Sequence, residues 1–186
     1  MFILASSSPR RSLLLKKCLK DFQIVIPKVD ERLLDRSIKA IDLAKEESRL
    51  KAYDVFRRYP EDEVLACDTI VLLDKEMLGK PFSQEEAIEM LKKESGKRQV
   101  VLSGYTYISK EKEISRTVAT SVYFNSLTEA KIREYIKIFK PFDKAGSYGI
   151  QDDFPLIKKI VGSYDNVMGL PTEDILVHVF NSLPRR

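Results

Sequence analysis

One carboxylate stands inside the most apolar stretch of the chain. Asp68 interrupts the run from Val64 to Leu73, which otherwise has the composition of a central buried strand. A buried carboxylate must be paired, bound to a metal ion or shifted in pKa, because an isolated charge is costly to remove from water. The alternative is a strand bend or a sheet edge at which Asp68 meets water. Asp68 is therefore the first candidate for acid–base or metal chemistry.

A loop rich in serine and arginine follows the first apolar segment, over residues Ser6 to Arg11. Ser8 suits the N-cap of a helix and Pro9 its first position. Acidic residues are favoured next, yet Arg10 and Arg11 stand there. Free N–H groups, hydroxyls and guanidinium groups at a strand-to-helix turn suit a phosphate chain. The alternative is a capped helix with solvated arginines; the Walker pattern does not occur.

Two further segments could approach a ligand. The segment from Asp143 to Gln151 combines charged residues, two glycines and an aromatic, which suits backbone lying close to a ligand. Lys80, in Gly-Lys-Pro, could reach the same anion. Both segments also suit ordinary structural loops, and Glu31 and Lys51 taken alone suit solvated surface charges.

The histidine and cysteine content excludes several kinds of catalysis. His178 is the only histidine, which excludes Ser-His-Asp triads, Cys-His pairs and histidine-rich metal sites. Cys18 and Cys67 lie in apolar segments without C-x-x-C spacing, so neither a disulfide framework nor a zinc knuckle is predicted, and a cytoplasmic location is expected. Catalysis would then use carboxylates, lysines, arginines and a metal ion.

Composition predicts one globular domain. Of the 186 residues, 44% are hydrophobic, which is enough for a core. Lys and Arg number 32 against 28 Asp and Glu, and this surplus of +4 suits a phosphorylated small molecule rather than a nucleic acid. No stretch approaches the roughly 18 apolar residues of a membrane span, so no membrane partner is expected.

Strand and helix patterns alternate along the chain, which predicts an α/β fold with a mixed sheet. Strands are expected at Phe2–Ala5, Phe22–Ile26, Val64–Leu73, Val100–Ser109 and Ile114–Phe124, the last two as an antiparallel pair. Helices are expected after Pro9, over Ile41–Tyr59, from the capping box of Ser83 and Glu86 to Lys93, after Thr128, and from near Pro171 or Thr172. Residues 140–169 show little periodicity.

Several of these segments occur in the order of a known family. They are Leu4 to Arg11, Glu31, Lys51-Ala52, Asp68-Thr69, Gly79-Lys80-Pro81, Ser95-Gly96, Asp143 to Gln151, and Asn166 to Pro171. Along nearly the whole chain they resemble the Maf family of nucleoside triphosphate pyrophosphatases. The resemblance implies one domain over residues 1–186, with a mixed β-sheet, flanking helices and the two-lobed Maf/Ham1 (ITPase-like) architecture with a central cleft. It also implies hydrolysis between the α and β phosphates.

The resemblance implies roles for individual residues. Asp68 would be the base, a ligand of Mg²⁺ or Mn²⁺, or both, and Glu31 is the second candidate ligand. The residues that would bind substrate are Ser6, Ser8, Arg10, Arg11, Lys51, Thr69, Lys80 and Gln151. Among them Arg11, Lys51 and Lys80 would neutralise the triphosphate. Arg10, Thr69 and Gln151 fall on the positions that separate the subgroups of the family, and they fit the subgroup that favours dTTP and UTP.

Three residues depart from the family pattern and other functions stay open. Gln99 stands where histidine is common, Lys140 where glutamate usually precedes proline, and Asp152 where glycine usually follows Gln151, so that Asp152 could alter the base pocket. The alternatives are a nucleotide-binding regulator of cell division without significant turnover, a phosphate-releasing NTPase, and a pyrophosphatase for a modified purine triphosphate. We also expect that the protein could form a homodimer and that it acts in nucleotide-pool clearance.

Overall fold

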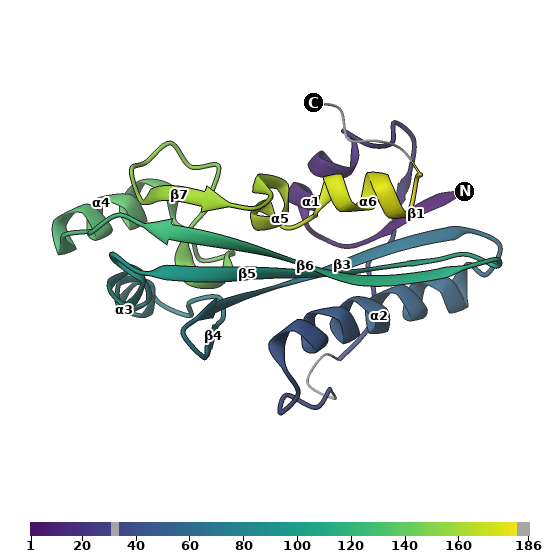
Figure 1. The fold of residues 1–186 in the computed structure, drawn as a ribbon, viewed down its shortest axis with the longest axis horizontal. Helices are drawn as coiled ribbons and strands as arrows, with labels where there is room; N and C mark the ends of the chain where they lie inside the picture. Colours follow the sequence, from purple (N-terminus) through teal and green to yellow (C-terminus); the bar gives the residue numbers. More distant parts are fainter. Residues whose placement is uncertain (31–33, 182–186) are drawn as a thin grey trace. The chain divides into compact units, whose positions relative to one another are not determined.

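The computed structural model describes residues 1–30 and 34–181, with the elements labelled in Figure 1. The strands are β1 (Phe2–Ala5), β2 (Gln23–Ile24), β3 (Glu63–Leu73), β4 (Glu76–Leu78), β5 (Arg98–Ile108), β6 (Glu113–Phe124) and β7 (Ile157–Val161). The helices are α1 (Pro9–Leu15), α2 (Ala40–Arg58), α3 (Gln84–Glu94), α4 (Glu129–Phe139), α5 (Tyr164–Met168) and α6 (Thr172–His178), with the short 3₁₀ helix η2 (Ala145–Ser147).

In the described part of the chain the strands form one mixed seven-stranded sheet. Its order is β2-β1-β3-β5-β6-β7, and β4 pairs with β3. β1 lies parallel to β2 and β3, whereas the β3–β4 and β6–β7 pairs are antiparallel. The neighbours β5 and β6 are joined by a tight turn, in which Ser109 N–H donates to the carbonyl of Lys112 at 2.9 Å. The predicted α/β class, with a mixed sheet and flanking helices, is confirmed.

The chain divides into two compact units. Unit 1 comprises Met1–Thr69, Leu102–Val118 and Asp165–Arg186, and unit 2 comprises Ile70–Val101 and Ala119–Tyr164. The strands β3, β5 and β6 each contribute residues to both units. The expectation of one domain over residues 1–186 stays a prediction. Across residues 1–30 and 34–181, no helix has both the length and the apolar character needed to cross a bilayer.

The structure differs from the sequence-based expectation in its short elements. β2 covers only Gln23–Ile24 instead of Phe22–Ile26, because this edge strand pairs with β1 alone. Residues 140–169 contain η2, β7 and α5, which are too short to show a clear period. β4 follows a turn at Asp74, whose φ is 56°, and pairs back onto β3.

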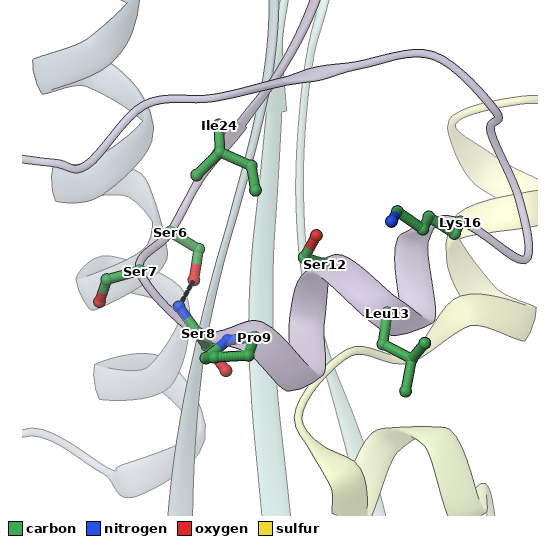
Figure 2. Close-up of a pocket in the computed structure, with 8 residues that line it drawn as sticks. All are labelled: Ser6, Ser7, Ser8, Pro9, Ser12, Leu13, Lys16 and Ile24. Carbon is green, nitrogen blue, oxygen red and sulfur yellow. Dashed lines mark hydrogen bonds between the residues drawn. The ribbon is translucent and has the colours of Figure 1, made fainter.

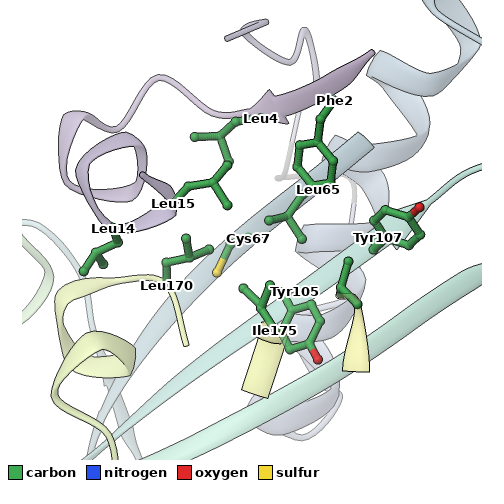
Figure 3. Close-up of a cluster of buried hydrophobic side chains, with 11 residues drawn as sticks. Phe2, Leu4, Leu14, Leu15, Leu65, Cys67, Tyr105, Tyr107, Leu170 and Ile175 are labelled. Atoms are coloured by element: carbon green, nitrogen blue, oxygen red, sulfur yellow. The ribbon is translucent and has the colours of Figure 1, made fainter. Parts of the chain in front are cut away.

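In unit 1 the sheet is covered on both faces, by α1 and α6 on one side and α2 on the other (Figure 1). Successive side chains of a strand point to opposite faces, so β1 and β3 serve both layers. Leu4, Leu65 and Cys67 belong to the cluster beside α1 and α6 (Figure 3). The alternate residues, such as Val64 and Ala66, pack in a second cluster that includes residues of α2. Asp68 and Thr69 come next along β3.

Helix α2 lies directly on β5 at Gly104. A Cβ atom at this position would lie 2.1 Å from the carbonyl oxygen of Ala44 in α2. Two residues further along the strand, Thr106 Oγ1 lies 2.7 Å from Ser48 Oγ of the same helix. The missing side chain of Gly104 therefore sets how close α2 comes to the sheet.

In unit 2, α3 and α4 begin at the predicted caps and contact each other. Ser83 Oγ accepts the N–H of Glu86 at 3.1 Å, and Thr128 Oγ1 accepts that of Lys131 at 3.3 Å, which confirms both caps. Helix α3 ends at Glu94, which is fully buried.

Glu94 lies against the segment that carries η2. Its Oε1 would be 2.8 Å from a Cβ atom at Gly146, and neither carboxyl oxygen has a hydrogen-bond partner within the described residues. Burial raises the pKa of Glu94 well above its usual value. Ionisation of this side chain therefore lowers the stability of unit 2.

We expect Gly104→Ala to lower the free energy of unfolding by about 1–3 kcal/mol, because the added methyl group overlaps the backbone of α2. Urea denaturation measures this loss. Gly79→Ala is the matched control, since a Cβ atom at Gly79 meets no atom within 4 Å. Equal losses in the two variants would contradict the close contact.

We expect Glu94→Gln to stabilise the protein increasingly as pH rises. The pKa of Glu94 is higher in the folded than in the unfolded chain, so its favourable contribution is complete below the unfolded pKa and is lost as pH rises through the folded pKa. The gain should grow by at most about 1.4 kcal/mol per pH unit. Urea denaturation at several pH values checks it, with the exposed Glu89→Gln as control; parallel pH profiles of wild type and Glu94→Gln would refute the effect.

Candidate functional site

Asp68 faces α2, where it meets a lysine. Lys51 Nζ donates to Asp68 Oδ1 in a short contact, and the two side chains are only 13% and 14% exposed. β3 runs unbroken through this position, between the end of its pairing with β1 at Ala66 and the start of its pairing with β4 at Val71. Of the three outcomes predicted for a buried carboxylate here, the structure shows the first, an ion pair.

A second carboxylate lies beside Asp68. Glu47 precedes Lys51 by one turn of α2, which places both on one face of the helix. The Glu47 side chain is 3% exposed, its Oε1 lies 3.1 Å from Arg36 Nη2, and its carboxyl group is hydrogen-bonded with that of Asp68. Sequence reasoning missed Glu47. The available signal was an acidic residue in the otherwise apolar stripe of α2.

The surroundings of Asp68 favour its ionised form. Burial raises the pKa of this carboxyl group, but the Lys51 ammonium, the hydrogen bond with Glu47 and the charge of Arg11 together lower it below its usual value. Asp68 is thus an ionised carboxylate in a nearly dry environment at neutral pH. Such a group can accept a proton or bind a cation.

Thr69 faces the opposite layer, where it meets Arg11 of α1. Arg11 Nη2 donates to Thr69 Oγ1 at 3.2 Å, and Arg11 Nε donates to the carbonyl of Gly169 at 2.9 Å. Both acceptors are uncharged, and no carboxylate of the described residues forms an ion pair with Arg11. Its positive charge therefore remains available to an anion.

The turn that carries Gly169 is held by a buried acid. Asp165 accepts from Lys17 Nζ at 2.8 and 3.0 Å and from the hydroxyl of Thr172 at 2.5 Å. Gly169 itself has a φ of 118°, which favours glycine. The thiol of Cys67 also donates to the Gly169 carbonyl, and burial raises its pKa to about 11, so the thiol stays protonated.

A pocket of about 410 Å³ lies beside the serine loop (Figure 2). Its lining consists of Ser6, Ser7, Ser8, Pro9, Ser12, Leu13, Lys16 and Ile24. Ser6 Oγ accepts from the N–H of Ser8 at 3.1 Å, and Ser8 Oγ accepts from the N–H of Arg11 at 3.5 Å, which confirms Ser8 as the N-cap. Asp68 and Lys51 are not part of this lining.

The two predicted residues of unit 2, Lys80 and Gln151, are exposed. Their segments meet, because Gly146 N–H donates to the carbonyl of Gly79 at 3.1 Å. The carboxyl group of Asp152 lies against Gly149 of its own segment. It accepts a hydrogen bond from the hydroxyl of Tyr135 in α4 at 2.5 Å. The assignment of Lys80 and Gln151 to substrate stays a prediction.

Two predicted residues, Arg10 and Glu31, remain to be placed. Arg10 is partly buried in the first turn of α1. Glu31 lies outside the described residues. Within unit 1 the structure brings together Arg11, Lys51, Asp68 and Thr69, together with the unpredicted Glu47. Asp68 and Glu47 are the described carboxylates that could share a cation.

The chain is similar to known proteins along most of its length. Residues 1–180 match the family model described as Maf-like protein. A dTTP/UTP pyrophosphatase of Pyrococcus abyssi (strain GE5 / Orsay) is 43% identical over 192 aligned positions that cover all of both chains. A dTTP/UTP pyrophosphatase of Thermosipho africanus (strain TCF52B) is 43% identical and covers 93% of this chain and 88% of its own.

A more distant likeness is to the solved structure of the Staphylococcus aureus Ham1 protein, with 15% identity, a TM-score of 0.46, and 66% of this chain and 71% of that chain covered. The match that identifies the chain is the family model, which extends over nearly its full length. The chain belongs to the family of Maf-like proteins.

Proposed function

We propose that the protein is a nucleoside triphosphate pyrophosphatase that converts dTTP and UTP to the monophosphate and pyrophosphate, in the clearance of unwanted nucleotides. Two relatives that are 43% identical carry the name dTTP/UTP pyrophosphatase. The observation that carries the proposal is the buried, ionised Asp68, held by Lys51 and close enough to Arg11 for their charges to interact.

The charges around Asp68 suit hydrolysis of a phosphoanhydride. In the proposed reaction a water molecule attacks the α phosphorus and Asp68 accepts its proton, which requires an ionised carboxylate. Arg11 would contact the negative charge of the phosphates, because both of its hydrogen-bond acceptors are neutral groups. Lys51 keeps Asp68 ionised, in addition to the contact with phosphate expected from the sequence.

A divalent cation, Mg²⁺ or Mn²⁺, is part of the proposal. The described residues contain no group of three His, Cys, Asp or Glu side chains suited to a metal ion. They do bring together the carboxyl groups of Asp68 and Glu47, and Mg²⁺ is commonly held by one or two carboxylates and substrate phosphates. These two residues would hold the cation, and Glu31 stays a candidate ligand predicted from the sequence. When bound, it would supply polarisation of the phosphoryl oxygens.

The preference for dTTP and UTP is assigned to Arg10, Thr69 and Gln151. A glutamine amide offers both a donor and an acceptor, which suits the alternating O4, N3–H and O2 edge of uracil or thymine. Mismatched bases would leave polar groups unpaired. A cytoplasmic location, a homodimer and the absence of nucleic-acid and membrane partners stay predictions.

The decisive experiment measures the products from a panel of triphosphates with Mg²⁺. We expect pyrophosphate and monophosphate, with kcat/KM for dTTP and UTP above that for ATP, GTP and 7-methyl-GTP, and no turnover once the metal is chelated. Release of inorganic phosphate would indicate the phosphate-releasing alternative. Binding without turnover would indicate the regulatory one.

We expect Asp68→Asn to lower kcat by about 10²–10⁴-fold, because the amide cannot accept a proton. Steady-state kinetics with dTTP and thermal unfolding of the same sample measure activity and folding together. Asp54→Asn is the matched control, since Asp54 is a partly exposed acid of α2 that is likewise paired, with Arg58. A folded Asp68→Asn enzyme with the kcat of the wild type would exclude Asp68 as the base.

We expect Lys51→Met to shift the acidic limb of the pH–rate profile to higher pH. The Lys51 charge lowers the pKa of Asp68, so its removal raises that pKa, and a base with a raised pKa loses activity at a higher pH as the solution is acidified. The profile of kcat/KM against pH measures the shift. An unmoved acidic limb in a folded variant would mean that this limb does not report Asp68.

A further inference from the structure

Ser103 is a buried hydroxyl that the proposed mechanism does not use. It lies on β5, two residues from Tyr105, and therefore on the α1 and α6 face of the sheet. Its exposed fraction is 0%. Ser103 Oγ lies 2.9 Å from Thr69 Oγ1 and donates to the carbonyl of Asn166 at 3.1 Å. The residue thus touches Thr69, which in turn holds Arg11.

The number of protons determines the direction of these bonds. A serine or threonine hydroxyl has one proton to donate and two lone pairs that accept. The Asn166 carbonyl can only accept, so it takes the proton of Ser103. Thr69 must then donate its own proton to Ser103, and its oxygen accepts from Arg11 Nη2. The chain of donors therefore runs from Arg11 through Thr69 and Ser103 to the backbone.

We propose that Ser103 is a positioning residue for Arg11, which fixes the hydroxyl of Thr69 so that its oxygen accepts from the guanidinium group. This inference rests on the proposed function for its kinetic consequence only. With Gly169 bound at Nε and Thr69 at Nη2, the guanidinium plane is held at two points. Without the Ser103 hydroxyl, Thr69 loses its oxygen acceptor, and its proton can turn toward the sulfur of Cys67 or toward Arg11.

The kinetic test compares Ser103→Ala, Thr69→Val and Thr69→Ser. Loss of one hydrogen bond in the chain should raise KM for dTTP about three- to tenfold, with kcat within about twofold, because Arg11 contacts substrate and transition state alike. Ser103→Ala should show this rise, and Thr69→Val at least as large a rise because Thr69 is also assigned to the nucleotide base. Thr69→Ser, which keeps the hydroxyl, should restore most of the affinity. In an Arg11→Ala background the effect of Ser103→Ala should disappear.

Thr106→Val is the matched control. Thr106 is a buried threonine on the same strand whose hydroxyl pairs with Ser48 of α2 on the other face. The Thr106→Val variant should be less stable than the wild type but should have the same KM for dTTP. An unchanged KM in folded Ser103→Ala, or the same rise when Arg11 is absent, would overturn the proposal.

A spectroscopic measurement keeps this inference separate from the proposed function. Side-chain ¹⁵N NMR of arginine reports rotation about the bond between Nε and Cζ, which exchanges the two Nη nitrogens and which a held guanidinium group undergoes slowly. Rotation in Arg11 should be slow in the wild type and faster in Ser103→Ala, even if no triphosphate is hydrolysed. Equal rotation in both proteins would overturn the role of Ser103, whatever the panel of triphosphates shows.

Discussion

The burial of a carboxylate in a central strand is the constraint on which unit 1 depends. Asp68 continues a strand whose preceding residues are fully buried, and a lone charge there would be strongly unfavourable. The ion pair with Lys51 offsets most of the cost of burying this charge, but only if α2 lies close enough to the sheet for the pair to form. Gly104 allows this short distance, because it has no side chain between β5 and the backbone of α2. Packing and electrostatics are therefore a single requirement here.

The alternation of side chains along β3 explains how one strand serves two roles. Asp68 meets α2 and Thr69 meets α1, although they are neighbours in the chain. The acid and the arginine thus reach the carboxyl end of the parallel strands from opposite layers, close enough for their charges to interact. In open α/β sheets this end is where ligands usually bind. A strand with one polar face would not bring both groups to the same place.

Much of the site follows from local conflicts in the sequence. Asp68 is charged where a buried strand favours apolar residues, and the two arginines after Ser8 stand where the first turn of a helix favours acids. Conflicts of this kind are expected at functional positions. Glu47 was harder to identify, because an acid on a helix is normally solvated and only the tertiary contact with β3 shows otherwise. Ser103 gives no signal at all, since a serine in a strand is ordinary. Short elements such as β7 and α5 depend on pairing and turns that no period reveals.

The discontinuity of unit 1 affects how the protein is made. Its described residues come from three separate stretches of chain, and the last begins only at Asp165. During synthesis on the ribosome, α1 and β3 emerge long before the carbonyls of Asn166 and Gly169 that anchor Ser103 and Arg11. The contacts of unit 1 that use this last stretch can form only after residues 165–181 have been synthesised. Lys51 and Asp68 both belong to the first stretch and are present early, whereas Arg11 has no Gly169 carbonyl to bind until the last stretch has been made.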